Sequence, residues 1–298
     1  NPLTGLLDYN TDQLGKRTNY TYFENASIKS IVNRNNQTIN YAYDEINRLK
    51  TVTGININRT FTYDLNDNIE KIDDNNGTLS FSYDEQNRLI SYTDFYNNLV
   101  KYEYDKVGNI NHRAYKTGKV VDYTYYPDNL LNTVKDWNNR ITSYIYRNDG
   151  SIDQVNLPNG TYTKYSYDAA GRLIGLANKK SDGIIINSHT YTLDAVGNHK
   201  NVTSNEPLSS PPLTAANITY GYDKANRIQN AGSTTFTHDL NGNMTKQVDG
   251  GVTTDYTYYQ ENRLSNVRGT FNASYGYDAL GFRRLATRNG VSSRYVLD

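Results

Sequence analysis

Aromatic and polar positions alternate in short segments along the whole chain, and these segments recur at nearly constant spacing. The phrase YAYDEINRL begins at residue 41, and FSYDEQNRL, YSYDAAGRL and YGYDKANRI follow the same arrangement from residues 81, 165 and 220. Two aromatic residues separated by one polar residue lie on the same face of a β-strand, because successive side chains point to opposite faces. Each phrase therefore predicts a strand. Repetition at fixed spacing is typical of structural units that stack on copies of themselves.

The second aromatic position of each phrase, which we call the marker, recurs with most intervals between 19 and 21 residues. The fourteen marker positions are Tyr22, Tyr43, Tyr63, Tyr83, Tyr104, Tyr125, Tyr146, Tyr167, Leu193, Tyr222, His238, Tyr258, Tyr277 and Leu297. The longest interval, 29 residues before Tyr222, contains a proline-rich stretch that predicts a surface loop at 204–217. Because the phrase continues on both sides of this loop, we expect one repeat segment over residues 1–298.

A turn is predicted after each marker. Asp follows the marker in ten of fourteen repeats, and Gly or Asn stands four residues after it in eleven of thirteen. A turn-initiating Asp accepts a hydrogen bond from a backbone N–H two residues on, and Gly and Asn tolerate the left-handed conformation. The Gly or Asn positions are 47, 87, 108, 129, 150, 171, 197, 226, 242, 262 and 281.

Apolar residues beyond the turn are three positions apart, as at Leu49 and Val52. This spacing does not suit a flat strand and predicts a β-bulge between them. A second turn then closes the repeat, and four dipeptides suggest hairpin turns with two left-handed residues: Asn76-Gly77, Asn159-Gly160, Asp182-Gly183 and Asn289-Gly290. The prediction is an all-β fold of repeated antiparallel hairpins of ~20 residues, about 28 strands with no long helix, in one long twisted sheet that curls or closes.

Composition narrows the possible functions. The chain has 29 Tyr against 7 Phe and one Trp, which suggests that the hydroxyl ends reach water or a hydrogen-bond partner. The formal charge is zero, which argues against a nucleic-acid partner. There is no Cys for disulfide or thiol chemistry, and the aliphatic run at 184–186 is far too short to span a membrane. The first residues lack the features of a signal peptide, so we expect a piece of a longer polypeptide.

The phrase YxYDxxGRL at this spacing resembles the RHS/YD-repeat family. The opening TGLLDYNTDQLGKRTNYTY and the closing YGYDALGFRRLATRNGVSSRYVLD carry the resemblance to both ends of the chain. The resemblance implies a β-sheet that spirals into a hollow shell, and in bacterial members this shell encloses a C-terminal toxin. It also relates the chain to the cocoon of insecticidal toxin complexes and to the teneurin barrel. The self-cleaving plug region of such proteins would lie beyond Asp298. Neither cleavage nor toxin activity is therefore assigned to any residue here.

Four groups of residues in the sequence are of types that can form functional sites. The row of Asp residues could bind calcium, but its spacing does not match calcium-binding β-rolls, and capping of turns explains it better. The four His show no metal-ligand spacing, and His238 occupies a Tyr position. The pair Asp73-Asp74 could suggest glycoside hydrolysis, but it lies near an expected turn. An Arg recurs at one repeat position, where pairing with the neighbouring Asp is favoured over a functional basic stripe; these are Arg48, Arg88, Arg172, Arg227 and Arg263.

The sequence therefore predicts no catalytic residue, no cofactor-binding residue and no metal site. The main hypothesis is a non-enzymatic shell segment of a secreted or cell-surface bacterial RHS protein, whose partners are the remainder of its own shell and an enclosed toxin polypeptide. The alternative is an adhesion surface that binds carbohydrate or a cell-surface partner through exposed Tyr and Asn. Neither hypothesis involves a membrane span.

Overall fold

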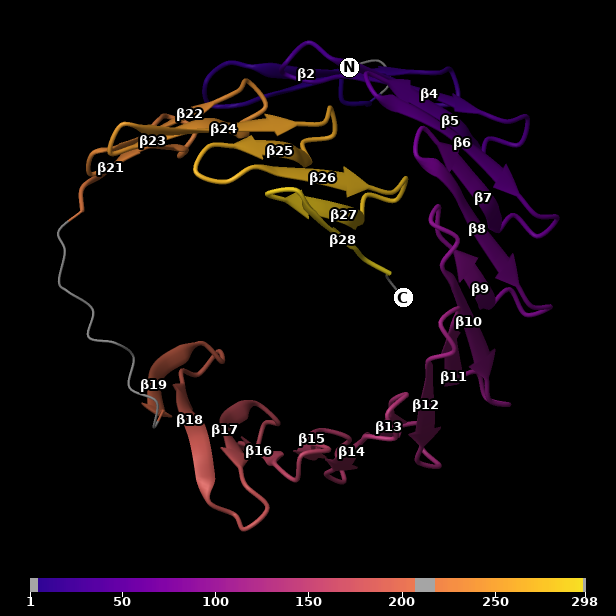
Figure 1. Ribbon diagram of the computed structural model, residues 1–298, viewed down its shortest axis with the longest axis vertical. Coiled ribbons are helices and arrows are strands. Elements are labelled where there is room, and N and C mark those ends of the chain that lie inside the picture. The colour runs from indigo at the N-terminus through magenta and orange to yellow at the C-terminus, as the bar shows by residue number, and fades with distance from the viewer. Residues whose placement is uncertain (1–4, 207–217, 297–298) are drawn as a thin grey trace. The chain divides into compact units, whose positions relative to one another are not determined.

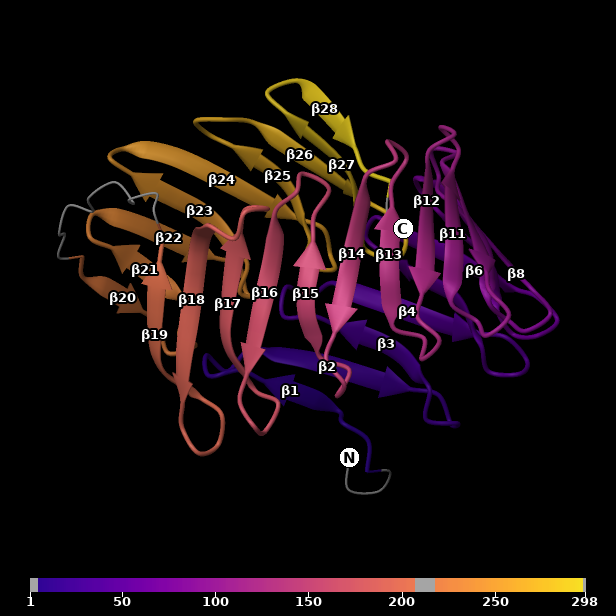
Figure 2. The same ribbon diagram turned by 90° about the horizontal axis from the view of Figure 1, so that it is seen from below.

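The computed structural model describes residues 5–206 and 218–296. Within these residues there is no helix, and 28 strands follow one another, each antiparallel to its neighbours in the two sheets (Figures 1 and 2). Strands β1–β19 belong to a 19-stranded sheet and strands β20–β28 to a nine-stranded sheet. The predicted all-β hairpin fold is confirmed. The proline-rich loop predicted at 204–217 lies outside the described residues from 207 onward.

The chain divides into two compact units, residues 1–99 with 216–298 (unit 1) and residues 100–215 (unit 2). The first strands of unit 1 are β1 (Tyr9–Thr11), β2 (Arg17–Tyr22), β3 (Ile28–Val32), β4 (Thr38–Tyr43), β5 (Leu49–Gly54), β6 (Ile57–Tyr63), β7 (Ile69–Asp74), β8 (Gly77–Tyr83) and β9 (Leu89–Thr93). Its last strands are β20 (Tyr220–Tyr222), β21 (Ile228–Ala231), β22 (Thr234–His238), β23 (Met244–Asp249), β24 (Val252–Tyr258), β25 (Leu264–Arg268), β26 (Ala273–Tyr277), β27 (Arg283–Arg288) and β28 (Val291–Arg294).

Unit 2 carries the same hairpins without interruption. Its strands are β10 (Leu99–Tyr104), β11 (Ile110–Tyr115), β12 (Val120–Tyr125), β13 (Leu131–Lys135), β14 (Ile141–Tyr146), β15 (Ile152–Asn156), β16 (Tyr162–Tyr167), β17 (Leu173–Lys179), β18 (Ile185–Leu193) and β19 (His199–Asn205). Most of the buried apolar side chains belong to unit 1, for example Ile72 and Leu79 on the long sheet and Val267 and Ala286 on the nine-stranded sheet. Unit 1 therefore holds the better-developed core.

The predicted bulge explains the three-residue spacing of the apolar positions. Tyr41 lies opposite Val52, and Tyr43 lies opposite Leu49, with a register shift between these pairs. The extra residue, Lys50, restores the alternation, so that both apolar side chains face a tyrosine across the strand pair. The same shift follows the marker of the other repeats, as in β6–β7 and β16–β17.

The left-handed positions are also confirmed. All thirteen described residues four positions after a marker have positive φ, including Ala26 (67°) and Asp67 (66°), which depart from Gly and Asn. The prediction for the second turn of each repeat was wrong in three of four cases. Only Asn289-Gly290 has two left-handed residues, with φ of 46° and 83°. At Asn159-Gly160 only the glycine is left-handed, because this loop is one residue longer than the loop at Asn289-Gly290. It closes through hydrogen bonds from Leu157 N–H to Thr161 O and from Gly160 N–H to Leu157 O.

Candidate functional site: a seam between turns

The first turn of each repeat, which we call the Tyr–Asp turn, is held by its aspartate. At Asp84 one carboxylate oxygen accepts the backbone N–H groups of Gln86 and Arg88, both at 2.9 Å, and the other accepts the Arg88 Nε–H at 2.7 Å. The hydrogen bond from the Arg88 side chain, joined by that from its backbone N–H, lowers the pKa of Asp84. Asn replaces Arg at several repeats, as at Asp64 and Asn68. The aspartate row thus caps turns, as predicted.

In six repeats the marker tyrosine ties the repeat to the one before it. Its hydroxyl donates to the backbone carbonyl of the first aliphatic residue of the preceding repeat, next to the bulge. The bonds are Tyr63 to Leu49 (2.7 Å), Tyr83 to Ile69 (3.1 Å), Tyr125 to Ile110 (2.8 Å), Tyr146 to Leu131 (2.9 Å), Tyr167 to Ile152 (2.9 Å) and Tyr277 to Leu264 (3.1 Å). This contact accounts for the choice of Tyr over Phe, because the hydroxyl supplies a donor where the bulge interrupts the strand ladder.

Unit 1 contains contacts between turns that are about two hundred residues apart in sequence. The second turn of each repeat, which we call the return turn, lies at one edge of β1–β9, and there it meets the Tyr–Asp turns of β20–β28. In Figure 1 the β24–β25 and β26–β27 connections lie on the side of the nine-stranded sheet that faces β4–β9. We call this row of contacts the seam.

The first described contact of the seam joins the β3–β4 and β22–β23 turns. Asn35 donates its backbone N–H to Asn241 Oδ1 (3.2 Å) and its side-chain N–H to Asp239 Oδ2 (3.0 Å). In return, the Leu240 backbone N–H donates to Asn35 Oδ1 (3.0 Å). One asparagine therefore forms hydrogen bonds with three polar groups of the opposite turn, through its backbone N–H and both ends of its side-chain amide.

The second contact joins the β5–β6 turn to the β24–β25 turn. Gln260 is buried, and its Oε1 accepts the Ile55 backbone N–H at 2.6 Å. A Cβ atom at Gly54 would come within 2.5 Å of this Oε1, so the absence of a side chain at Gly54 lets the glutamine approach the backbone. Beside it, the Arg59 guanidinium makes two hydrogen bonds to Glu261, at 2.8 and 2.5 Å. Burial opposes ionisation of Glu261, but the hydrogen bonds and charge of Arg59 prevail and lower its pKa.

The remaining contacts lie further along the seam. Asn76, in the β7–β8 turn, donates its side-chain N–H to the Tyr277 carbonyl oxygen at 3.4 Å. Arg284 is 2% exposed and donates to the Tyr92 hydroxyl, while its Nε–H donates to the fully buried Asp278 at 2.7 Å. The seam is therefore closed by a buried ion pair that reaches across to β9.

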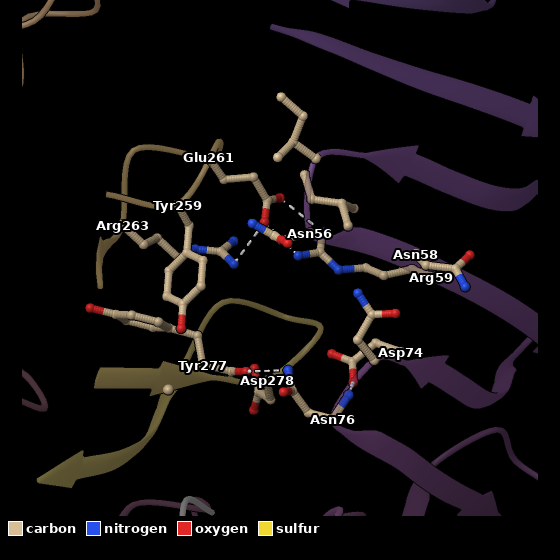
Figure 3. Close-up of a pocket in the computed structure, with 14 residues that line it drawn as sticks. Asn56, Asn58, Arg59, Asp74, Asn76, Tyr259, Glu261, Arg263, Tyr277 and Asp278 are labelled. Carbon is tan, nitrogen blue, oxygen red and sulfur yellow. Dashed lines mark hydrogen bonds and ion pairs between the residues drawn. The ribbon is translucent and has the colours of Figure 1, made fainter. Parts of the chain in front are cut away.

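A cavity of about 270 Å³ opens between the second and third contacts of the seam. Figure 3 shows Glu261 between the guanidinium groups of Arg59 and Arg263, with Arg263 Nη1 at 3.0 Å from the Glu261 carboxylate. The edges of the cavity carry exposed amides at Asn56 and Asn58. The charged groups of Glu261 and Arg59 are thus paired with each other, and the neutral amides remain open to solvent.

The other residue groups considered from the sequence lie apart from one another. His112 contacts Asp122 (2.7 Å), His189 contacts Ser204 (3.0 Å), His199 stacks on Tyr191 and His238 pairs with Met244 across β22–β23. Asp73 contacts Thr78, and Asp74 caps the β7–β8 turn through the Asn76 and Gly77 N–H groups. Within the described part of the chain, no three His, Asp or Glu side chains gather as metal ligands would.

The recurring arginines form the predicted pairs with aspartate at Arg48, Arg88, Arg172 and Arg227, whereas Arg263 pairs with Glu261 because Tyr259 occupies the Asp position. The seam residues were not identified from the sequence. Two seam repeats depart from the consensus, because Tyr259 replaces Asp and Phe282 replaces the usual Arg or Asn. The Asp position is also replaced outside the seam, at Phe23, Tyr126 and Arg147, so these departures alone do not identify the seam.

The sequence matches the family model described as teneurin YD-shell over residues 21–149 and 161–296. A search of curated proteins found no match. Among the residues that the structure describes, no helix is long and apolar enough to cross a membrane.

The fold is similar to that of two solved complexes. The crystal structure of TcdB2-TccC3 aligns with a TM-score of 0.70, covering 96% of this chain and 20% of that chain at 15% identity. The crystal structure of TcdB2-TccC3-Cdc42 aligns with a TM-score of 0.65, covering 92% and 19% at 16% identity. The chain spans about a fifth of the length of those chains. With the family match over most of its length, the chain belongs to the teneurin YD-shell family of RHS/YD-repeat proteins and is a segment of shell-type β-sheet.

Proposed function

We propose that this chain is a non-enzymatic wall segment of a secreted or cell-surface bacterial RHS-repeat shell that encapsulates and delivers a C-terminal toxin. The observation that carries the proposal is the seam, in which Tyr–Asp turns dock on return turns through backbone and side-chain hydrogen bonds. A container needs its wall sealed between neighbouring stretches of sheet, and the seam provides such a seal. The recurring Tyr and Asp side chains are occupied in holding the repeats together, which suits a structural role.

A protease-protection experiment on the complete natural polypeptide tests this function. The region C-terminal to this segment should resist proteolysis in the intact protein and become accessible when the seam is weakened by Arg59→Met together with Arg284→Met. The variant Arg172→Met, which removes an exposed ion pair of unit 2, serves as the control and should preserve protection. Rapid digestion of the C-terminal region in the folded wild-type protein would refute encapsulation.

The cavity beside the seam favours a second candidate, a carbohydrate-binding surface. Exposed amides at Asn56, Asn58 and Asn75 line it together with Tyr259. Amides both donate and accept hydrogen bonds and so suit sugar hydroxyls, and an aromatic ring suits the apolar face of a sugar. A glycan array probed with the complete chain tests this candidate. Binding that Asn56→Ala and Asn58→Ala abolish would support it, and an array without signal would exclude it.

A further inference from the structure

Four asparagines of the chain precede a glycine, and such pairs can modify themselves. They are Asn76, Asn159, Asn241 and Asn289. The backbone nitrogen of the glycine can attack the side-chain amide of the asparagine, because glycine has no side chain to hinder the approach. The attack forms a cyclic imide and releases ammonia, and water then opens the imide to aspartate or isoaspartate. The nitrogen loses its proton in the attack, so a base within hydrogen-bond reach of that N–H speeds the reaction.

The pair Asn76-Gly77, in the β7–β8 return turn, has such a base. The Gly77 N–H donates to Asp74 Oδ1 at 3.1 Å. At Asn159 and Asn241 the N–H of the following glycine donates instead to a backbone carbonyl oxygen. A carboxylate can take up the proton, whereas a backbone carbonyl cannot. Asn76 is also exposed and lines the cavity beside the seam, so water for the second step reaches it.

The hydrogen bonds of each asparagine determine what its conversion to a carboxylate would do. Asn159 and Asn289 accept hydrogen bonds through Oδ1, from Thr161 and Asn272 respectively, and a carboxylate can still accept them. Asn76 instead donates its side-chain N–H to the Tyr277 carbonyl oxygen across the seam, at 3.4 Å (Figure 3). A carboxylate has no proton to donate, so conversion of Asn76 removes a contact of the seam.

The charge of the cavity makes a new carboxylate at Asn76 unfavourable. Its charged lining residues are two arginines and three acidic residues, a formal charge of −1: Arg59, Arg263, Asp74, Glu261 and Asp278. Conversion of Asn76 would bring this charge to −2. The new carboxylate would also stand beside Asp74, which already accepts the Asn76 backbone N–H at 2.6 Å. Repulsion between like charges therefore adds to the loss of the hydrogen bond.

We propose that Asn76 is a self-modification site, in which Asp74 acts as the base and the product weakens the seam. Gly77 N forms a bond to Asn76 Cγ while its proton passes to Asp74 Oδ1. The bond between Cγ and Nδ2 breaks, and Nδ2 leaves with that proton as ammonia. Water then adds to one carbonyl of the imide and opens the ring, which leaves a carboxylate at residue 76. The inference concerns the β7–β8 turn and depends on neither a toxin nor a carbohydrate.

Timed incubation of the complete chain at mildly alkaline pH, followed by peptide mapping with mass spectrometry, tests the chemistry. Asn76 should convert faster than Asn159. The variant Asp74→Asn keeps an acceptor oxygen but lacks the base, and it should slow conversion of Asn76 by roughly tenfold or more. In that variant the rates at Asn159 and Asn241 should stay the same, and the unchanged rate at Asn241 shows that the seam is intact. Conversion of Asn76 that is no faster than that of Asn159, or that Asp74→Asn does not slow, would overturn the proposal.

Urea denaturation of variants that carry the product tests the effect on the seam. Asn76→Asp should have a lower urea midpoint than the wild type. Asn76→Ala removes the hydrogen bond without adding a charge, and its midpoint should lie between the two. The matched control Asn159→Asp, where the carboxylate keeps the acceptor role, should unfold at the wild-type midpoint. Equal midpoints for Asn76→Asp and the wild type would contradict the weakening of the seam.

Discussion

The repeat at Tyr167 and the repeat at Tyr277 are built alike up to their left-handed glycine and then diverge. In the first, the Nε–H of Arg172, five residues after the marker, donates to Asp168 at 2.7 Å, and the arginine side chain is 38% exposed. In the second, Phe282 occupies that position and Arg284, two residues later, makes the same 2.7 Å contact to Asp278. There the two side chains are 2% and 0% exposed.

The difference shows how one repeat serves two purposes. A solvent-exposed ion pair contributes little beyond holding its own turn. Moving the arginine by two residues removes the pair from water and lets the guanidinium reach Tyr92 across the seam. The shared positions of the repeat build the sheet, and in the repeat at Tyr277 a departure from them supplies part of the contact between stretches of sheet.

Removing the arginine should give the largest effect. Arg284→Met should destabilise unit 1 by about 3–5 kcal/mol, because it leaves the buried carboxylate of Asp278 without its charged partner. Arg172→Met should cost no more than about 1 kcal/mol. Thermal and urea denaturation of the complete chain compare the two variants. Equal losses would show that the two ion pairs are equivalent and would remove the basis of the comparison.

Substitution of the left-handed glycines should give intermediate effects. At Gly171, with φ of 74° and open space around it, Val should cost more than ~1 kcal/mol and Asn clearly less. At Gly281 a Cβ atom would lie 2.4 Å from Arg263 Nη2, so Asn there should cost more than Asn at Gly171. Melting temperatures of the three variants test this order. Equal melting temperatures for Gly171→Val and Gly171→Asn would contradict the conformational explanation.

Loss of the marker hydroxyl should lower the free energy of unfolding by a similar amount in both repeats, and by less than loss of the Arg284 side chain. Tyr167→Phe and Tyr277→Phe each remove one hydrogen bond to a backbone carbonyl, and each should cost about 0.5–1.5 kcal/mol. Urea midpoints measured side by side check this expectation. A much larger loss at Tyr277 alone would indicate that the hydroxyl also supports the seam.

Acidification should have the smallest effect per residue. The backbone N–H of Arg172, and then its side chain, lower the pKa of Asp168 in the folded state. A carboxylate with a lowered pKa stabilises the fold fully above its unfolded value of about 3.9, and this contribution is lost as the pH falls through the folded value. The urea midpoint should therefore fall below about pH 4, and slightly less steeply in Asp168→Asn. If the urea midpoint fell with pH equally steeply in Asp168→Asn and in the wild type, ionisation of Asp168 would not contribute to stability.

The repeat could be predicted from the sequence because its causes are local. The positions of Tyr43, Asp44 and Asn47 specify a strand, a cap and a left-handed residue within five positions, and the bulge followed from the spacing of Leu49 and Val52. The number of left-handed residues in the return turns was overestimated because it depends on loop length, which the dipeptides alone do not determine.

The seam could not be predicted because its partners are remote in sequence. Asn35 and Asn241 are 206 residues apart, and Arg59 and Glu261 are 202 apart. No periodicity connects them, and their side chains are common surface types. The departures at Tyr259 and Phe282 do not single out the seam, because the docked turn at 239–243 keeps the consensus residues.

The register of the seam is the central claim, and a crosslinking experiment tests it most directly. The chain has no natural Cys, so Asn35→Cys with Asn241→Cys introduces a single pair of thiols across the first contact. A short bis-maleimide should link these two positions within one molecule, as read by mass spectrometry of the monomer. Asn56→Cys with Asn241→Cys, displaced by one repeat, should remain unlinked. Efficient crosslinking of the displaced pair, or none of the first, would contradict the docking of Tyr–Asp turns on return turns described here.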